Sequence, residues 1–229
     1  MNRQLIIQKI IDLTKAKSYL EIGVEQGFTF LTIKAKKKVA VDPCFSITFA
    51  RKLKWIIKNF CNISARYYEV TSNYYFKNIC SPRSLEIVFV DGLHTYDQAL
   101  YDIENSLINI KNGGVVILHD CNPPHKNAAM PAKSHKQAAM QKLPGWTNEW
   151  CGDVWKAICH LRSFRNDLNI FVLDCDYGIG IITKGVSENN LYLNRAEIDN
   201  LTFDDLKANR KKFLNLKSVE FLEIFLKNL

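Results

Sequence analysis

The 229-residue sequence predicts an α/β fold in which a mostly parallel sheet ends with one antiparallel strand. The first observation is a strand–helix–strand pattern over residues 85–118, because a crossover of this length makes two strands parallel and neighbouring. The second is a strand, a glycine turn and a helix over residues 18–35. The third is a pair of apolar strands, residues 169–174 and 178–183, whose short connection makes them antiparallel.

The individual elements follow from apolar periodicity and from the residues that interrupt it. Residues 96–110 repeat apolar side chains at three- and four-residue steps, as a helix packed on a sheet does, and Asn112–Gly114 ends this helix. The expected helices are 1–17, 28–35, 49–60, 96–110 and 152–164, and the expected strands are 18–22, 38–41, 65–70, 85–90, 115–118, 169–174 and 178–183.

We predict a single domain over residues 1–229, since the chain shows no linker or internal repeat. Residues 1–17 form an N-terminal helix, and residues 185–229 form a helical C-terminal extension. Residues 123–150 are polar and lack periodicity, which favours a lid or substrate loop. Seven scattered cysteines indicate reduced thiols and a cytoplasmic location. No apolar run approaches the ~20 residues that span a bilayer, so we expect no membrane insertion.

The net charge of +8 and the isoelectric point near 9.1 raise the question of a nucleic-acid partner. Lysines gather at residues 34–38 and 207–217. No aromatic residues alternate with them to stack on bases, so we interpret them as solvated surface, and a nucleic-acid methyltransferase or binder is the alternative function. Assembly into a homo-oligomer is left open.

Acidic and imidazole side chains follow both strands of the 85–118 unit. Asp91 and His94 come after the first strand, and His119 and Asp120 come after the second. Because α/β sheets bind ligands beside the carboxyl ends of their strands, we expect the chemistry there. Two carboxylates can hold Mg²⁺ or another divalent metal, and His94 can accept a proton near neutral pH. A metal-free site, in which the acids cap loops, is the simpler reading.

The glycine turn predicts a nucleotide-like ligand at the same edge of the sheet. Glu21 precedes Gly23 and Gly27, and Asp42 ends the second strand, where a carboxylate can accept hydrogen bonds from ribose hydroxyls. The spacing differs from the G-x-G-x-x-G of dinucleotide enzymes, and the Gly-Lys-Ser/Thr of phosphate-binding loops is absent from the sequence.

The turn, the acid before it and the terminal hairpin together resemble the class I S-adenosylmethionine-dependent methyltransferases, over residues 18–183. Within them the sequence is most similar to the macrocin- and mycinamicin-type sugar O-methyltransferases. The resemblance implies a three-layer, Rossmann-like sheet of seven strands, of which the last is antiparallel. It implies transfer of a methyl group from S-adenosyl-L-methionine to a hydroxyl of a sugar, a glycan precursor or another small-molecule or carbohydrate acceptor.

The resemblance also implies a role for each matching residue of the cofactor site. Glu21, Gly23 and Gly27 surround the methionine part of the cofactor, Asp42 holds its ribose and Ser72 lies near its adenine. Asp91 and Gly92 lie beside the sulfonium.

The catalytic residues implied by the same resemblance are His94 and Asp91. Asp91-x-x-His94 matches a motif that combines a metal ligand with a general base. The relatives complete the metal site with a Glu-Asp pair, for which this sequence has His119-Asp120. The implied metal ligands are Asp91, His119 and Asp120, although an imidazole at position 119 is a softer ligand.

A different motif, Asn122-Pro-Pro-His125, resembles that of the adenine and cytosine amino-methyltransferases. It follows the fifth strand here and the fourth strand there, so base methylation is not the expected reaction.

Overall fold

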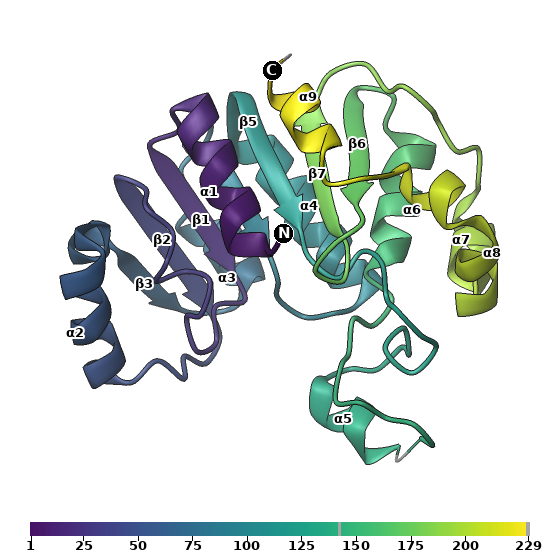
Figure 1. Ribbon diagram of the computed structural model, residues 1–229, viewed down its shortest axis with the longest axis horizontal. Helices are drawn as coiled ribbons and strands as arrows, with labels where there is room; N and C mark the ends of the chain where they lie inside the picture. Colours follow the sequence, from purple (N-terminus) through teal and green to yellow (C-terminus); the bar gives the residue numbers. More distant parts are fainter. Residues whose placement is uncertain (142, 228–229) are drawn as a thin grey trace.

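The computed structural model describes residues 1–141 and 143–227. In this part of the chain an eight-stranded sheet has the order β3-β2-β1-β4-β5-β7-β6-β8, and β7 runs antiparallel to both of its neighbours (Figure 1). The strands are β1 (Ser18–Ile22), β2 (Lys37–Asp42), β3 (Arg66–Glu69), β4 (Leu85–Val90), β5 (Ile110–Leu118), β6 (Leu168–Leu173), β7 (Ile179–Lys184) and β8 (Leu216–Lys217). The helices are α1 (Arg3–Thr14), α2 (Phe49–Lys58), η1 (Phe60–Ser64), α3 (Ser72–Asn78), α4 (Tyr96–Asn109), α5 (His135–Met140), α6 (Trp155–Phe164), α7 (Arg195–Asn200), α8 (Phe203–Leu214) and α9 (Phe221–Lys227).

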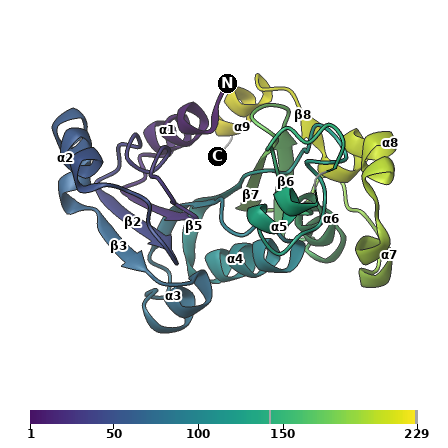
Figure 2. The ribbon, with the colours of Figure 1, turned by 90° about the horizontal axis from the view of Figure 1, so that it is seen from below.

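Each face of the sheet has its own apolar core, because successive side chains of a strand point to opposite faces. On one face Val88 and Val90 of β4 pack with residues of α4 and α6, including Ile103. On the other face Ile87 and Phe89 pack with Ile6, Ile7 and further residues of α1, and with Leu222 of α9. Figure 2 shows α1 and α9 on one side of the sheet and α3, α4 and α6 on the other. The predicted three-layer architecture is confirmed.

The sheet has one strand more than the seven predicted. The two residues of β8 pair in parallel with the end of β6 and extend the sheet beyond it. The predicted antiparallel strand is β7, which lies between β5 and β6. Phe221 and Phe225 of the C-terminal extension pack edge-on against Phe171 of β6. The last two residues, 228 and 229, lie outside the described part of the chain.

The helix predicted over residues 28–35 is wrong, since this segment folds as successive turns. Its carbonyl groups are hydrogen-bonded by side chains from elsewhere in the chain instead of by helical N–H groups. The Asn59 amide donates to Leu31 O (3.0 Å) and Ile33 O (2.9 Å), the Asn62 amide donates to Leu31 O (3.0 Å), and the Lys38 ammonium donates to Phe30 O. These contacts are long-range, so no local pattern could indicate them.

Two further details differ from the prediction. The short helix α3, which was not predicted, follows β3, and its N-cap is Thr71, whose hydroxyl accepts a hydrogen bond from Tyr74 N (3.2 Å). Strand β5 begins at Ile110 and includes the glycine pair that was expected to precede it, with a register shift against β4 near Leu85.

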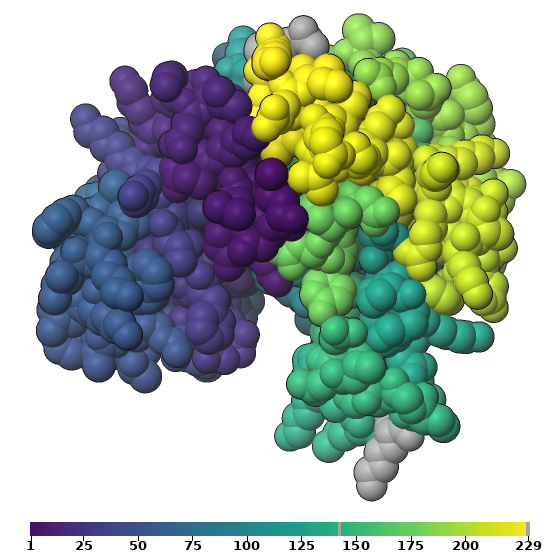
Figure 3. Space-filling view, in the orientation of Figure 1, coloured from purple at the N-terminus to yellow at the C-terminus, as the bar shows by residue number. Residues whose placement is uncertain are grey.

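The predicted lid, residues 123–150, projects from the body of the molecule and carries the short helix α5 (Figure 1). The space-filling view shows it as a separate protrusion (Figure 3). Residue 142 of this segment lies outside the described residues. None of the described helices is long and apolar enough to cross a membrane.

Candidate functional site

The loop after β1 is held in place by the end of β2. Gly23 has φ +82°, and a Cβ added to it would lie 2.0 Å from Asp91 O, so a larger residue does not fit. The Asp42 carboxylate accepts hydrogen bonds from Glu25 N and from Cys44 N, both at 2.8 Å. Asp42 therefore fixes the loop in an open turn beside the carboxyl ends of β1, β2 and β4.

Glu21 lies beneath this loop and is 2 % exposed. It accepts a hydrogen bond from the Tyr19 hydroxyl, and burial raises the pKa of Glu21 to about 8. Burial also lowers the pKa of the nearby Lys38 to about 8. Glu21 is thus largely protonated at neutral pH and can offer a hydrogen-bond donor to a ligand in the loop.

A cavity of about 1150 Å³ opens between this loop and the ends of β4 and β5. It is lined by every predicted site residue except Gly27, whose φ of +74° and contacts with Leu31 and Ile47 shape the turn from outside the cavity. The predicted residues on its wall are Glu21, Gly23, Asp42, Ser72, Asp91, Gly92, His94, His119 and Asp120.

Gln98 and Asp102 of α4 form a polar wall that the sequence reasoning missed. The Gln98 amide donates to Ser72 Oγ (3.2 Å) and to Asp102 Oδ1 (3.0 Å). Burial raises the pKa of Asp102 to about 6. The missed signal was a carboxylate on the apolar stripe of the 96–110 helix, because polar side chains rarely occupy a buried face without a partner or a ligand.

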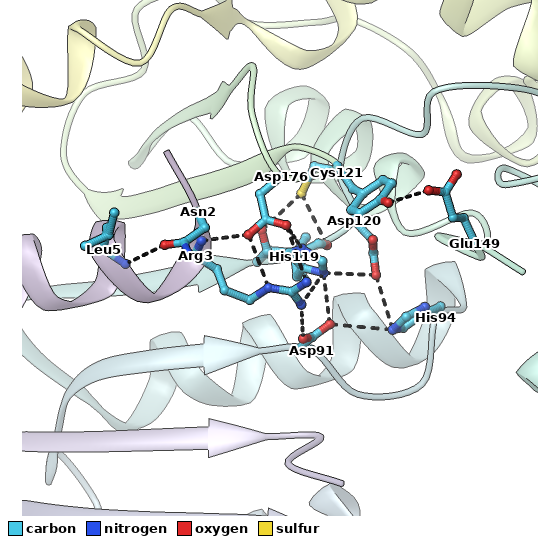
Figure 4. Close-up of polar contacts among 12 residues, drawn as sticks. Asn2, Arg3, Leu5, Asp91, His94, His119, Asp120, Cys121, Glu149 and Asp176 are labelled. Carbon is cyan, nitrogen blue, oxygen red and sulfur yellow. Dashed lines mark hydrogen bonds and ion pairs between the residues drawn. The ribbon is translucent and has the colours of Figure 1, made fainter. Parts of the chain in front are cut away.

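The predicted acidic cluster is present where β4 and β5 end (Figure 4). His119 Nδ1 lies 3.1 Å from Asp91 Oδ1 and 3.1 Å from Asp120 Oδ2. His94 Nε2 lies 3.3 Å from Asp120 Oδ2 and 3.6 Å from Asp91 Oδ1, while His94 Nδ1 lies 2.6 Å from Trp150 O of the lid segment. Asp120 has φ +61°, a left-handed conformation that Asp tolerates better than most residues. The four side chains thus form one network.

Two charged residues from distant parts of the chain complete the cluster, and the sequence reasoning missed both roles. Arg3, the first residue of α1, donates to Asp91 Oδ2 (2.8 Å) and to Asp176 Oδ2 (3.2 Å). Asp176, in the β6–β7 turn, also accepts from Arg3 N (2.7 Å) and lies 3.6 Å from His119 Nε2. Asp176 lies in the short connection between the two predicted antiparallel strands. Nothing in the sequence around Arg3 indicates that it contacts the site.

The charges of this cluster shift each other's ionisation. Burial opposes ionisation of Asp91, but the charges of His119 and His94 outweigh it and hold the pKa of Asp91 well below its usual range. Burial alone would lower the pKa of His94, yet Asp120 and Asp91 raise it to about 9. The pKa of His119 is raised in the same way, against burial, by Asp91 and Asp120. Both imidazoles therefore tend to carry a proton in this arrangement, alongside the charge of Arg3.

The donor set also fits a divalent metal ion. One ligand atom each from Asp91, His94 and Asp120 lies within 4.8 Å of the others; the two carboxylates suit Mg²⁺ or Mn²⁺, and an imidazole favours a softer ion than Mg²⁺. This set differs from the predicted one in its histidine. His119 points its Nδ1 between the two carboxylates, where it makes hydrogen-bond contacts with both.

Comparison with known proteins supports a methyltransferase. Residues 20–121 match the family model of a methyltransferase domain, which spans β1 to the end of β5. No curated protein matches this chain at a significant level.

Similar folds occur among solved structures. A candidate caffeoyl-CoA O-methyltransferase from Staphylococcus aureus has a TM-score of 0.55 and 17% identity, with 81% of this chain and 85% of that chain covered. The S-adenosylhomocysteine-bound methyltransferase PaMTH1 from Podospora anserina has a TM-score of 0.57 and 15% identity, covering 79% and 76%. The third is the O-methyltransferase TomG from Streptomyces achromogenes, which is involved in tomaymycin synthesis and was solved in complex with S-adenosylmethionine. It has a TM-score of 0.53 and 13% identity, with 80% of this chain and 78% of that chain covered. Residues 20–121 thus match a methyltransferase domain and the chain shares the fold of these enzymes, which confirms the predicted enzyme class.

Proposed function

We propose that the protein is an S-adenosylmethionine-dependent O-methyltransferase that acts on a hydroxyl of a sugar or a related small metabolite. The observation that carries the proposal is one cavity of about 1150 Å³ that contains both the Asp42-anchored loop and the Asp91–His94–Asp120 group. This volume is slightly larger than that of most ligand pockets, which is about 300–1000 Å³, so the cavity has room for a cofactor and an acceptor together.

The loop side of the cavity would bind the cofactor. Asp42 keeps lone pairs for the ribose hydroxyls, and Ser72 with Gln98 and Asp102 offers hydrogen-bonding groups to the adenine. Gly23 and Gly92 lie where β1 and β4 end and leave room for the methionine part. Asp91, directly after β4, would lie between this side and the acceptor side.

The acceptor side would orient the hydroxyl and take its proton. His94 Nε2 faces the two carboxylates, and its Nδ1 is fixed by Trp150 O, so the ring is held in one orientation. A divalent metal held by Asp91 and Asp120, with His119 as in the predicted set, would supply a Lewis acid that lowers the pKa of the acceptor hydroxyl and would leave Nε2 of His94 free to take the proton. The positive charge of the metal would offset the carboxylate charges that raise the pKa of His94. His94 could then be neutral near neutral pH and serve as the base.

The binding step is tested by titration calorimetry with S-adenosylmethionine and S-adenosylhomocysteine. Binding of both is expected, and failure to bind either would refute the proposal. Methyl transfer is then measured on nucleotide sugars and polysaccharide fragments, with and without EDTA. A loss of activity in EDTA that Mg²⁺ or Mn²⁺ restores would support the metal, and activity that is insensitive to EDTA would exclude it from the reaction.

We expect His94→Ala to leave cofactor affinity nearly unchanged and to lower turnover by about 10²–10⁴-fold, the usual contribution of a general base. The matched control is His125→Ala, because His125 does not line the cavity, although it pairs with Glu149, which does. Equal losses of cofactor affinity and turnover in His94→Ala would make His94 a structural residue.

A further inference from the structure

Helix α2 forms the outer edge of the molecule beside β2 and β3 (Figure 1), and the turn η1 follows it in the chain. Both elements expose apolar side chains. Phe49, Leu53 and Ile57 follow each other at four-residue steps along α2 and are 81%, 51% and 70% exposed. Phe60 and Ile63 of η1 continue the row and are 74% and 66% exposed. We call these five side chains the edge patch. Helices of globular proteins normally turn such a stripe toward the core.

Helix α2 contacts the protein through Arg51, Lys52 and Trp55, and Trp55 packs against the apolar core on that face of the sheet. The Arg51 guanidinium lies 4.7 Å from the centre of the Phe28 ring and donates to Gln26 O (2.9 Å). The Lys52 ammonium lies 4.1 Å from the centre of the Tyr67 ring. With Asn59 bonded to the 31–33 segment, these contacts leave the apolar side in solvent. The edge patch is therefore a feature of the folded state.

The positive charge of the protein is concentrated around the same edge. Residues 26–68 contain nine lysines and arginines, of which only Lys38 is buried, and one acidic residue, Asp42, while Glu25 and Glu69 flank the range. Lys54 and Lys58 are exposed on α2. Lys36 is also exposed and lies next to η1, because Ser64 Oγ donates to Lys36 O (3.0 Å). Apolar side chains bordered by lysines on a short helix are the pattern of a helix that lies in the surface of an anionic bilayer.

We propose that the edge patch docks the protein on membrane surfaces that contain anionic lipid. Phe49, Leu53 and Ile57 enter the boundary between headgroups and acyl chains, while the surrounding lysines bind lipid phosphates. A second copy of the chain is a poorer occupant, because two such edges carry the same charge. A nucleic acid is also a poorer partner, because its phosphates would bind the lysines but would leave the apolar side chains of the edge patch exposed to water.

Docking would bring the cavity close to the membrane. Phe28 lines the cavity, is 63% exposed and is held by Arg51 of α2. Phe28 is therefore an exposed apolar side chain on the rim of the cavity, next to α2. Membrane docking does not depend on the reaction that takes place inside.

The experiment is co-sedimentation of the full chain with vesicles of phosphatidylcholine and phosphatidylglycerol in equal parts, and with vesicles of phosphatidylcholine alone. Wild type is expected to bind the anionic vesicles and to bind the neutral ones at least about tenfold more weakly. The double variant Leu53→Glu with Ile57→Glu should bind anionic vesicles at least about tenfold more weakly than wild type. Its control is Ile108→Glu on α4, where Ile108 is 68% exposed, and this variant should bind as wild type does.

A second pair of variants separates charge from apolar contact. Lys54→Gln with Lys58→Gln should weaken binding and reduce its dependence on salt, whereas Lys133→Gln with Lys136→Gln on the lid segment should not. The proposal is overturned if wild type does not bind anionic vesicles, or if the Leu53/Ile57 variant binds them unchanged. It is also overturned if that variant instead dissociates a dimer in sedimentation, or if wild type binds single-stranded RNA and not vesicles.

Discussion

Arg3 supplies a positive charge to a cluster of three carboxylates. Its guanidinium joins Asp91, at the end of β4, to Asp176, in the turn between β6 and β7. The same contacts fasten the start of α1 over the cavity, because Arg3 N also donates to Asp176. Arg3 therefore positions Asp91 and closes one side of the candidate site.

Replacing Arg3 by Gln should lower the free energy of unfolding by about 1–3 kcal/mol, since two partly buried carboxylates lose their charged donor. Arg3→Lys should recover part of this loss, because lysine restores the positive charge but not the planar guanidinium that can bind two carboxylates at once. Urea denaturation measures both. The control is Arg195→Gln, which removes an exposed ion pair with Asp97 and should cost less than about 1 kcal/mol. Equal effects at the two positions would contradict the positioning role.

Glu21 makes the stability of the cofactor-free protein depend on pH. Burial raises its pKa in the folded state from 4.5 to about 8. A carboxyl group with a raised pKa stabilises the fold in its protonated form, so the contribution is complete below pH 4.5 and is lost as the pH rises through about 8. Between these values the stability of wild type should fall relative to that of Glu21→Gln. Thermal melts of both proteins across this range measure the difference, and parallel curves would argue against a protonated Glu21.

Among the elements, the strands and their ends were predictable, whereas the segment after the glycine turn was not. Strand β4 is apolar apart from Glu86, and β5 ends in a continuous apolar run, so their positions, and those of Asp91 and Asp120, follow from the sequence. Residues 28–35 are also rich in apolar residues, and we predicted a helix there. In the structure, side chains from residues 38, 59 and 62 bind the carbonyl groups of this segment. The hydrogen bonds that replace the helix come from outside the local window.

Asn62→Ala should destabilise this segment by about 1–3 kcal/mol, because buried partners lose their hydrogen bonds. The amide of Asn62 donates to Leu31 O, and its carbonyl oxygen accepts from Lys38 Nζ at 2.6 Å. The control is Asn78→Ala, an exposed amide bonded to Tyr74 O, which should change stability by at most about 0.5 kcal/mol. Hydrogen exchange should also increase in residues 28–35 of the Asn62 variant. Unchanged exchange there would show that the segment holds its fold without Asn62.

In the molecule as a whole, the three layers meet around one cavity whose wall is contributed by distant parts of the chain. Residue 3 of α1, the β1–β2 loop, the ends of β4 and β5 and residues 148–151 after the lid helix all line it. A ligand in this cavity touches several elements at once and should stabilise them together.

S-adenosylhomocysteine should therefore raise the melting temperature. At 100 times its dissociation constant, a ligand that binds only the folded state adds about 2.7 kcal/mol. For a domain of this size this corresponds to about 5–10 °C. Differential scanning fluorimetry measures the shift, with ATP as the control ligand. Asp42→Ala should reduce the shift, since Asp42 anchors the loop through Glu25 N and Cys44 N. An equal shift with ATP would point to a different nucleotide.

The sequence alone was sufficient for the α/β class, the order of the strands along the chain, the glycine loop and the meeting of Asp91, His94, His119 and Asp120. These features depend on local apolar periodicity and on the rule that parallel strands end at one edge of a sheet. Tertiary structure decided the rest: the unwound 28–35 segment, the eighth strand, the polar wall of Gln98 and Asp102, and the Arg3–Asp176 contact. Arg3 and Asp176 are 173 residues apart, and such a pair is formed only when α1 packs on the sheet beside the β6–β7 turn.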